Sequence, residues 1–415
     1  MTEPLAPPPK KDPQKRTRVP LLPPRARSRA ALGLSCAAAE GRFMLQVCTE
    51  CGAVQYPPRD ACRACLATEL DWRDIEPGGT LLAETRVHAS PAPYFRERLP
   101  WRAGTVMLDA GVPVIAHVHG DVARGARVRV VARLDCAGQG VLLALPEKEV
   151  PHMEDDPMLR EMTADPRHRR VLITDARAPE GLPLAKALKA AGAALIFLGE
   201  PEPWRPWSGR DAFAGIEGAS LHPLDVTDTG SVREAAASLG GKTDILINTA
   251  RFTRPGGVID RTDTVFARDE MEVNYLGLMR LAQAFGPSMR ARGADGANSA
   301  AAWVNILPAH ALAHDPGFAS TTASGAAARA LSLSLRAELR AGGVKVMNVY
   351  TGPIDDEWHQ PLPPPKVAPT ALAKVIVAGL KDGLEEVFAG DVARDLAERW
   401  RCDPRLLDRE MEEGG

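Results

Sequence analysis

The sequence predicts a multi-domain fold in which a small four-cysteine module and a small antiparallel β-barrel precede a doubly wound parallel α/β sheet. Four cysteines lie in two close pairs between residues 48 and 65, and five short β-rich segments follow within residues 79–147. From about residue 170 onward, short apolar runs alternate with helical stretches, which is the pattern of βαβ units. At 415 residues the chain is long enough for two or three separate cores.

Composition and turn signals divide the chain into five segments. They are a tail at 1–29, a helix with the cysteine module at 30–70, the barrel at 71–149, a linker at 150–169 and the α/β domain at 170–415. The tail combines prolines with Lys and Arg at low hydrophobicity, so it cannot bury enough apolar surface and we expect disorder. The linker is acidic and punctuated by prolines, with a short helix expected at 157–162.

Bulk charge and hydropathy exclude several classes of partner. The formal net charge is −2 and 25% of the residues are charged, which favours neither nucleic acid nor a membrane surface. No apolar run approaches the roughly 18 residues needed to cross a bilayer. Cys36, Cys136 and Cys402 have no obvious mate, and this odd remainder is typical of a reducing compartment. We therefore expect a soluble, cytoplasmic protein.

The cysteine module carries the strongest chemical signal. The segment "CTECGAVQYPPRDACRAC" places Cys48 and Cys51, then Cys62 and Cys65, as two CxxC pairs separated by ten residues. Two intervening residues let both thiolates of a pair reach one ion, while Gly52 relieves the tight turn. Four thiolates favour tetrahedral zinc, and such a closed site has no position for water, so we expect the zinc to be structural. A rubredoxin-type iron centre or a pair of disulfides are the alternatives.

The β-rich segments after the cysteines indicate a small antiparallel barrel. His117 and His119 share one face of a strand, but no acidic or cysteine partner stands nearby at ligand spacing, so we interpret them as solvated or packed strand histidines. Residues 41–150 contain thirteen basic residues (Lys and Arg) and thirteen acidic residues (Asp and Glu), so this part of the chain has no net charge. A neutral domain supplies little phosphate neutralisation, so nucleic-acid binding is discounted.

Residues 30–149 contain, in order, an apolar helix, "GRFMLQVCTECGAVQYPPRDACRAC", "GTLLAETRV" and "VMLDAGVPVIAHV". This order resembles acyl-CoA-associated proteins that join a rubredoxin-like zinc ribbon to an OB-fold. The resemblance implies a partner of thiolase-like or hydratase-like subunits, in which the barrel handles a CoA thioester. By the same resemblance Arg59 faces an anionic phosphate; the alternative is that its side chain covers the ribbon surface.

The region from about 170 to 400 carries a second ordered set of motifs. They are "LDVTD" with Asp225, "DILIN" with Asn248, "VNYLG" with Asn274 and "GPIDD" with Gly352. This region resembles the short-chain dehydrogenase/reductase family, which implies a Rossmann fold with a doubly wound parallel sheet. In that family a glycine-rich loop approaches the cofactor's pyrophosphate, and a Tyr, a Lys, a Ser and an Asn perform the chemistry.

The loop that would bind the cofactor departs from the family pattern. Aligned on Thr174 it reads "TDARAPEG", so Asp175 and Pro179 replace the first two glycines and only Gly181 is retained. Proline offers no amide donor, and a carboxylate repels a diphosphate. At ~4 Å and an effective dielectric of ~20, each like-charged pair costs about 4 kcal/mol, or roughly three decades of affinity. We expect no tight NAD(P) binding and no cofactor-binding residue in this domain.

The catalytic residues of the family are also replaced. By the resemblance, Pro308 occupies the serine position, Thr321 the tyrosine position and Gly325 the lysine position, with Asn274 retained. A threonine hydroxyl is too weak an acid to replace the phenol, and loss of the general acid/base alone costs about 10²–10⁴ in rate. Tyr275 and Tyr350 do not begin a YxxxK motif. We therefore expect no catalytic residue in this domain.

The segment 318–339, "FASTTASGAAARALSLSLRAEL", nevertheless keeps helical spacing. In the resembling family this helix packs in a four-helix interface between subunits, and Gly325 would permit close helix approach there. The alternative is that its alanines face the sheet of their own domain. The C-terminal segment 370–411 is expected to supply two amphipathic helices that cover the sheet edge or join an interface.

Together these features predict a non-catalytic subunit of an acyl-CoA-processing complex. The ribbon and barrel would dock on a thiolase-like enzyme, and the degenerate Rossmann domain would form a homo-oligomer. Its ligands would be a structural Zn²⁺ and a CoA thioester. The alternative from another class is an NAD(P)-dependent short-chain oxidoreductase that acts on a CoA-linked substrate with an atypical site.

Overall fold

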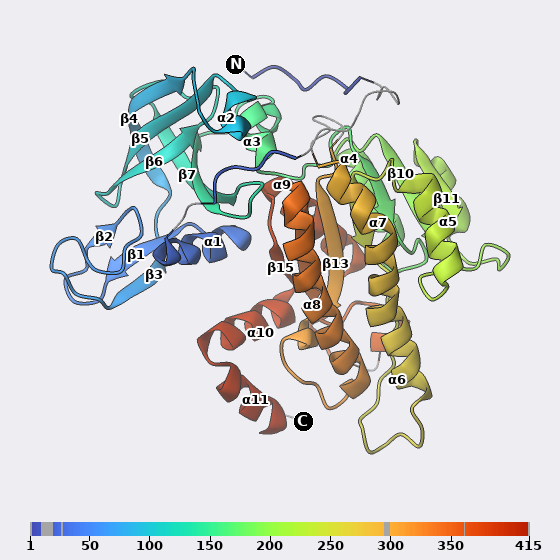
Figure 1. Cartoon of the computed structure of the whole chain (residues 1–415). Helices are drawn as coiled ribbons and strands as arrows, with labels where there is room; N and C mark the ends of the chain where they lie inside the picture. Colours follow the sequence, from blue (N-terminus) through green and yellow to red (C-terminus); the bar gives the residue numbers. More distant parts are fainter. Residues whose placement is uncertain (1, 10–19, 26–27, 294–298, 361, 414–415) are drawn as a thin grey trace. The chain divides into compact units, whose positions relative to one another are not determined.

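The computed structural model describes residues 2–9, 20–25, 28–293, 299–360 and 362–413 (Figure 1). These form two compact units, the first mainly Leu21–Ala164 and the second mainly Asp165–Leu380 with the residues from Glu385 onward. Residues 10–19 and 26–27 of the predicted tail lie outside the described residues. Within the first unit, Thr2 Oγ1 donates a hydrogen bond to Asp121 (2.9 Å), and the Leu5 N–H donates one to Asp155 (3.1 Å).

The first unit begins with a short helix and a small antiparallel sheet. Their elements are α1 (Leu32–Ala39), β1 (Met44–Cys48), β2 (Val54–Gln55) and β3 (Leu70–Asp74), with strand order β2-β1-β3. The buried Gln46 holds the sheet to the loop that follows β2. Its side chain accepts hydrogen bonds from Gln55 Nε2 (3.0 Å) and from the Arg59 N–H (2.8 Å), and it donates one to the Arg59 carbonyl (3.0 Å).

A closed five-stranded barrel follows, in the order β4-β5-β6-β8-β7. Its strands are β4 (Gly78–Val87), β5 (Trp101–Leu108), β6 (Pro113–Val118), β7 (Arg127–Leu134) and β8 (Gly140–Pro146). All five predicted β segments are therefore present, and every pairing is antiparallel except that of β6 with β8. Gly104 permits the tight packing of β5 on β4, because a Cβ there would lie 2.7 Å from the Ala83 carbonyl oxygen.

The two barrel histidines are packed against their own chain. Nδ1 of His117 accepts a hydrogen bond from Trp101 Nε1 at 2.8 Å. His119, just after β6, is fully buried; its Nδ1 accepts from the Asp121 N–H (3.1 Å) and its Nε2 lies 3.0 Å from the Met153 carbonyl. This confirms their interpretation as packed strand histidines.

Short helices close this unit. They are α2 (Pro93–Arg96) and α3 (Pro157–Glu161), the second of which is the helix expected near 157–162. Asp156 caps α3 by accepting hydrogen bonds from the Met158 and Leu159 N–H groups, both at 3.0 Å. Met158, Leu159 and Met162 then pack into an apolar cluster with Trp101 of the barrel. The end of this unit is therefore part of the barrel's packing.

The second unit is a seven-stranded parallel sheet in the order β11-β10-β9-β12-β13-β14-β15. Its strands are β9 (Arg170–Ile173), β10 (Leu195–Glu200), β11 (Ala219–Pro223), β12 (Ile245–Asn248), β13 (Ala302–Pro308), β14 (Lys345–Thr351) and β15 (Glu386–Ala389). The central strands are short and almost wholly apolar because helices cover both faces of a doubly wound sheet. This order is the predicted Rossmann topology.

Helices connect the strands. They are α4 (Gly181–Ala190), α5 (Thr229–Leu239), α6 (Val265–Glu270), the π-helical turn η4 (Met271–Gly277), α7 (Leu278–Ala291), α8 (Ala319–Leu339) and α9 (Pro369–Asp382). Figure 1 shows α7 and α8 running side by side along the sheet. The buried residues of α8 recur at helical spacing and form one face of the helix: Thr321, Ser324, Gly325, Ala328, Ser332, Leu335 and Leu339. This face, which is mostly made of small residues, packs against the core of its own domain.

The C-terminal segment differs from the prediction of two amphipathic helices. It contains three helices, α9, α10 (Asp391–Cys402) and α11 (Pro404–Glu413), and between α9 and α10 it contributes the edge strand β15. The short run "EVFA" pairs in parallel with β14, so this segment builds the sheet edge in addition to covering it. No helix in the described ranges is both long enough and apolar enough to span a membrane.

Candidate functional site

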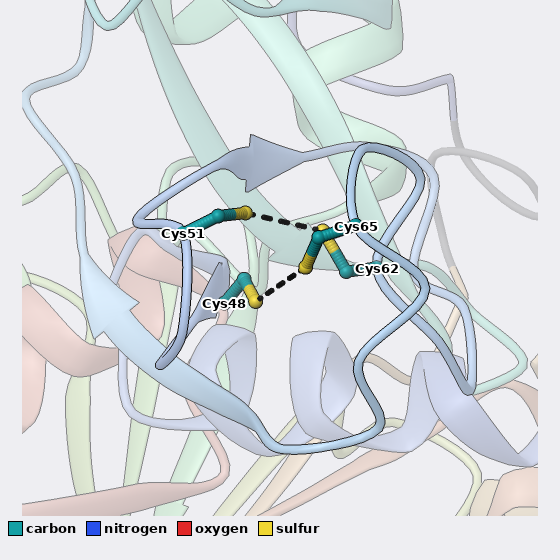
Figure 2. A group of neighbouring side chains, drawn as sticks. All are labelled: Cys48, Cys51, Cys62 and Cys65. Atoms are coloured by element: carbon teal, nitrogen blue, oxygen red, sulfur yellow. Dashed lines mark hydrogen bonds between the residues drawn. The ribbon is translucent and has the colours of Figure 1, made fainter.

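The four predicted zinc ligands converge at one end of the ribbon (Figure 2). The Sγ atoms of Cys48 and Cys65 lie 3.5 Å apart, those of Cys51 and Cys62 lie 3.6 Å apart, and all four fall within 4.8 Å of one another. A tetrahedral zinc with Zn–S bonds of about 2.3 Å requires S···S separations of roughly 3.8 Å. A disulfide requires about 2.05 Å, so the sulfur positions match a metal tetrahedron and not a pair of disulfides.

The local backbone and the crowding of thiols both favour a bound cation. Gly52 adopts φ +71°, the left-handed conformation that the first knuckle requires. The backbone N–H groups of Cys65 and Ala64 lower the pKa of Cys62 to about 6. Although the Ala67 N–H opposes it, the neighbouring thiols raise the pKa of Cys65 to about 12. A divalent cation removes this conflict, because it holds all four sulfurs as thiolates. The site therefore fits structural zinc.

The remaining cysteines and Arg59 lie outside this cluster. None of the seven cysteines forms a disulfide, and the Cys136 thiol donates to the Glu161 carbonyl at 3.0 Å. The Arg59 side chain is exposed on the ribbon, and no ion pair to it is found among the residues that the structure describes. Both interpretations of Arg59, as a phosphate contact and as a cover for the ribbon, are compatible with this exposure.

The second unit has a cleft at the carboxyl ends of three adjacent strands. Asn248, Pro308 and Thr351 are the last residues of β12, β13 and β14, and all three line it. The strand order changes direction between β9 and β12. Open α/β sheets bind their ligands outside the carboxyl ends of the strands, near such a switch point. Thr174 directly follows β9, and its hydroxyl donates to the side chain of Asn248 at 2.9 Å. This hydrogen bond joins the carboxyl ends of β9 and β12.

In the loop after β9, the polar groups form hydrogen bonds with one another. The Asp175 carboxylate accepts a hydrogen bond from the Arg177 N–H at 2.8 Å, and burial raises the pKa of Asp175. Pro179 lies in the turn that leads into α4. A Cβ on Gly181 would lie 2.4 Å from the Ala176 carbonyl oxygen, so packing of the turn on α4 is sufficient reason for this glycine.

A buried ion pair that the sequence analysis missed lies beside this loop. Glu180, at the N-terminus of α4, is fully buried, and Arg251 follows β12. The two side chains form a bidentate pair, with NH1–Oε1 at 2.5 Å and NH2–Oε2 at 2.7 Å. Although burial opposes it, the Glu180 carboxylate raises the pKa of Arg251. The available signal was a charged residue three positions after the end of a buried strand.

The acidic residue at the end of β10 also has hydrogen-bond partners within the protein. Dinucleotide-binding folds place an acid near this point, about 20 residues after the glycine loop, where it bonds the ribose. Here Glu200 accepts hydrogen bonds from Arg210 Nε (2.7 Å) and from Trp207 Nε1 (2.8 Å), and it is only 2% exposed. The Arg210 guanidinium holds the pKa of Glu200 below its usual range.

The three positions that the sequence matched to the family's serine, tyrosine and lysine have side chains that fit one another. The Thr321 hydroxyl donates to Glu270 at 2.6 Å, so it is already paired with a buried carboxylate. A Cβ on Gly325 would lie 2.6 Å from Cγ of Pro308. The close approach that requires Gly325 is therefore with Pro308 of its own domain. This corrects the interpretation of Gly325 as a contact between helices of two subunits.

The retained Asn274 holds secondary structure together. It lies in the π-helical turn η4, where its Oδ1 accepts from the Phe252 N–H (2.8 Å) and its Nδ2 donates to the Phe252 carbonyl and to Ser324 Oγ, both at 2.9 Å. Tyr350 is buried and stacks on Phe388 with ring centroids 5.2 Å apart. This tyrosine is thus a core residue.

Two histidines in the same cleft were also missed by the sequence analysis. Nδ1 of His359 lies 2.7 Å from Asp356 Oδ1, and Nε2 of His310 lies 3.4 Å from Asp315 Oδ2. Burial lowers the pKa of His310. Although burial opposes it, the hydrogen bond from His359 lowers the pKa of Asp356. His310 follows the serine-position residue by two, which was a usable signal, whereas nothing local marked His359.

Comparison with known proteins agrees with this division of the chain. Residues 37–71 match the family model described as "ChsH2, rubredoxin-like zinc ribbon domain", and residues 72–133 match "ChsH2, C-terminal OB-fold domain". Residues 169–366 match the model described as "short chain dehydrogenase". The fold class expected from the sequence is thereby confirmed: a zinc ribbon, an OB-fold barrel and a Rossmann domain.

Relatives of the second unit are short-chain dehydrogenases. The chain is 32% identical over 197 residues to "Short-chain dehydrogenase ptmH" of Penicillium ochrochloron, covering 44% of this chain and 69% of that protein. It is 29% identical over 181 residues to "3-ketodihydrosphingosine reductase" of Dictyostelium discoideum, covering 39% and 53%. The crystal structure of a short-chain dehydrogenase from Burkholderia cenocepacia J2315 in complex with NADP is 30% identical, with a TM-score of 0.53, over 60% of this chain and 99% of that one.

These matches define a protein built from a ChsH2-like ribbon and barrel joined to a dehydrogenase-type domain. Through that domain the chain belongs to the short-chain dehydrogenase family. It spans 53% and 58% of the length of two of its curated relatives, the Dictyostelium reductase and "Dehydrogenase/reductase SDR family member 7B" of Mus musculus.

Proposed function

We propose that this protein is an auxiliary subunit of an acyl-CoA-processing complex. In this proposal the ribbon and barrel dock on a thiolase-like enzyme and contact its CoA thioester. The Rossmann domain forms a homo-oligomer and performs no hydride transfer. The buried Glu180–Arg251 ion pair beside the loop that would bind the cofactor carries the second half of the proposal.

The first unit supports the docking role by its match to ChsH2 domains and by its exposed surface. Leu66, Leu82 and Ile115 are 78%, 47% and 65% exposed, although apolar side chains of this size are usually buried. A partner subunit would cover them. A cavity of about 230 Å³ beside the barrel, lined by Tyr94, Trp101 and other residues that include His117 and Asp135, is a space in which part of an acyl thioester would lie.

The crevice of the second unit does not suit a nicotinamide dinucleotide. A pyrophosphate needs free backbone N–H groups at the N-terminus of α4 and space for its charge. In this turn the Arg177 N–H already donates a hydrogen bond to the Asp175 carboxylate, and Pro179 has no N–H. The Glu180 carboxylate lies at the same helix terminus and adds a negative charge there. A diphosphate that separated Glu180 from Arg251 would leave a buried charge alone, which typically costs about 3–5 kcal/mol.

Proton transfer by the family mechanism also lacks its groups. Pro308 provides no hydroxyl, and the Thr321 hydroxyl donates to Glu270. Gly325 packs on Pro308 and provides no cation. Losing the general acid/base alone costs about 10²–10⁴ in rate, before the loss of its activator and of the cofactor is counted.

Oligomerisation would use the exposed apolar residues of the second unit. Val265 and Phe266 of α6 are 54% and 44% exposed, and Leu333 of α8 is 37% exposed. Size-exclusion chromatography with light scattering measures the state directly. We expect an oligomer that becomes smaller when Phe266 and Leu333 are replaced by Ser; a monomeric wild-type chain would contradict this part.

The test of the whole proposal is copurification with a thiolase-type acyl-CoA enzyme encoded next to this protein. We expect a stable complex, and we expect Leu66→Ser with Ile115→Ser to weaken it without changing the zinc content. Leu195→Ser, a 41% exposed residue of the second unit, is the matched control. A chain that captures no such partner and shows no calorimetric binding of a CoA ester would overturn the proposal.

A second candidate is an NAD(P)-dependent short-chain oxidoreductase that acts on a CoA-linked substrate. It is favoured by the likeness to the NADP-bound structure from B. cenocepacia and by the presence of a cleft at the usual strand ends. It predicts saturable binding of NADPH and NADPH-dependent reduction of a 3-oxoacyl-CoA, whereas the auxiliary role predicts neither.

A further inference from the structure

The cleft of the second unit contains polar groups that the fold itself does not use. Its walls are largely apolar, with Leu307, Phe318 and Leu362 among the lining residues. Thr322 and His310 also line it, and each has one buried polar atom, Oγ1 and Nδ1 respectively, with no hydrogen-bond partner in the described part of the chain. Buried polar atoms in folded proteins nearly always have partners, so two unpaired atoms in one cleft mark a place where a ligand supplies them.

His359 lines the same cleft in a defined tautomer. The Asp356 carboxylate accepts only, so the proton of His359 lies on Nδ1 and the lone pair on Nε2. The ring stacks on Phe318, with centroids 5.7 Å apart and an interplanar angle of 23°, which fixes its orientation. A carboxylate that orients an imidazole and leaves Nε2 as a base is the arrangement found in hydrolase triads.

His310 and Thr322 have complementary chemistry. Asp315 faces Nε2 of His310 at 3.4 Å and favours the proton on that nitrogen, so Nδ1 is left as a hydrogen-bond acceptor. The Thr322 hydroxyl is a donor. The loop that provides Asp315 also provides Phe318, so one loop positions both imidazoles.

We propose that this cleft exchanges the proton on the α-carbon of a β-hydroxyacyl thioester without a redox cofactor. Nε2 of His359 removes the proton, the Thr322 hydroxyl donates to the thioester carbonyl oxygen, and Nδ1 of His310 accepts from the β-hydroxyl. The thioester class rests on the proposed function, but the proton-transfer site does not. An activity of this chain's own goes beyond the auxiliary role.

The step is balanced within the site. The C–H bond at the α-carbon breaks, its electron pair forms the carbon–carbon double bond of an enolate, and the carbonyl π pair moves to oxygen beside Thr322. The proton rests on His359 Nε2 and exchanges with solvent, and its return to either face of the carbon regenerates the thioester. No electron leaves the substrate, so the result is isotope exchange or, at a branched α-carbon, epimerisation.

The experiment incubates the full zinc-loaded chain in D₂O with 3-hydroxybutyryl-CoA and, as matched probe, butyryl-CoA. Mass spectrometry measures deuterium at the α-carbon. We expect protein-dependent exchange that is faster with the hydroxylated probe. His359→Gln should reduce it by about 10²–10⁴-fold, Asp356→Asn should reduce it less, and His310→Asn should remove the preference for the hydroxyl.

The matched control is His222→Gln, a histidine in β11 that packs on Phe197 at the other edge of the sheet and should keep the wild-type rate. Circular dichroism and thermal unfolding verify each variant, and Asp356→Asn decides if His359→Gln does not fold. The wild-type rate in folded His359→Gln, or no exchange above the protein-free rate with either probe, overturns the proposal. Because no partner is present, failure here leaves the copurification test of the proposed function intact.

Discussion

The zinc ribbon and the Rossmann cleft are both formed by loops that follow strands, but the ribbon's side chains identify its ligand whereas those of the cleft do not. In the ribbon, all four thiols that a zinc ion needs are present and converge within 4.8 Å. In the cleft, the strand order is that of a Rossmann fold, and the proposed auxiliary role rests on matching Pro308, Thr321 and Gly325 to the serine, tyrosine and lysine positions of the family. A fold and the chemistry of its site are separable properties.

The family residues that persist in the cleft are those with partners inside the protein. Asn274 makes three hydrogen bonds to Phe252 and Ser324, and Asn248 accepts one from Thr174. A Cβ on Gly352 would lie 2.9 Å from Val392 Cβ, so packing alone requires a glycine there. In the alignment on which the proposal rests, the positions that differ are those whose partner in the family is a ligand. On the proposed auxiliary role, packing inside the protein preserves a motif whose ligand contacts are absent.

The largest expected effect is the loss of zinc and of folded structure in the ribbon when a cysteine ligand is replaced. Cys48→Ser removes one of four zinc ligands, and metal binding contributes about 10–16 kcal/mol to the folding of small zinc modules. We expect loss of bound zinc and rapid proteolysis between residues 41 and 70, measured by metal analysis and limited trypsin digestion. Cys402→Ser, an exposed thiol outside the ribbon, should change neither. A ribbon that resists trypsin without metal would show that zinc does not hold it.

The next effect tests whether the Glu180–Arg251 pair now supports the crevice. Arg251→Ala leaves the buried Glu180 carboxylate unpaired, and such losses cost about 3–5 kcal/mol. Urea unfolding followed by tryptophan fluorescence measures the loss. Arg409→Ala, in an exposed pair with Glu412, should cost less than about 1 kcal/mol. Equal, small effects of the two variants would mean that the buried pair contributes little.

A smaller effect tests the adaptation of Pro308 to Gly325. Gly325→Ala places a Cβ only 2.6 Å from Cγ of Pro308, and overpacking of this kind costs about 1–3 kcal/mol. Thermal unfolding should show a lower Tm, which Pro308→Ser in the same chain should largely restore. Gly286→Ala in α7 is the control, because no atom lies within 4 Å of its new Cβ. Identical shifts for Gly325→Ala with and without Pro308→Ser would rule out the adaptation.

The smallest expected effect is a change in the rate of zinc release, and it differs in sign between the two CxxC turns of the ribbon. Gly52 and Leu66 both follow the second cysteine of a pair and have φ of 71° and 66°, but only the first is a glycine. A non-glycine residue in this region costs about 1–2 kcal/mol, part of which glycine's greater chain entropy offsets. Leu66→Gly should therefore slow zinc release to a chelator by a few-fold, and Gly52→Ala should accelerate it. Faster release from Leu66→Gly would contradict the argument.

Local patterns in the sequence were sufficient for much of this molecule. The CxxC spacing predicted the thiol cluster, and alternating apolar residues predicted all five barrel strands. The Glu180–Arg251 pair was missed because its members are 71 residues apart and meet only through the strand order. The same applies to His359, which reaches the cleft from the loop after β14. The strand β15 was too short and too near two helices to be distinguished from them.

The proposed auxiliary role predicts that the Rossmann crevice does not bind a nicotinamide dinucleotide, and calorimetric titration of the purified chain with NADPH tests this central claim most directly. The account predicts no saturable heat at micromolar NADPH, and no change in the fluorescence of the reduced nicotinamide. Tight, stoichiometric NADPH binding, with consumption of NADPH on addition of a 3-oxoacyl-CoA, would contradict it.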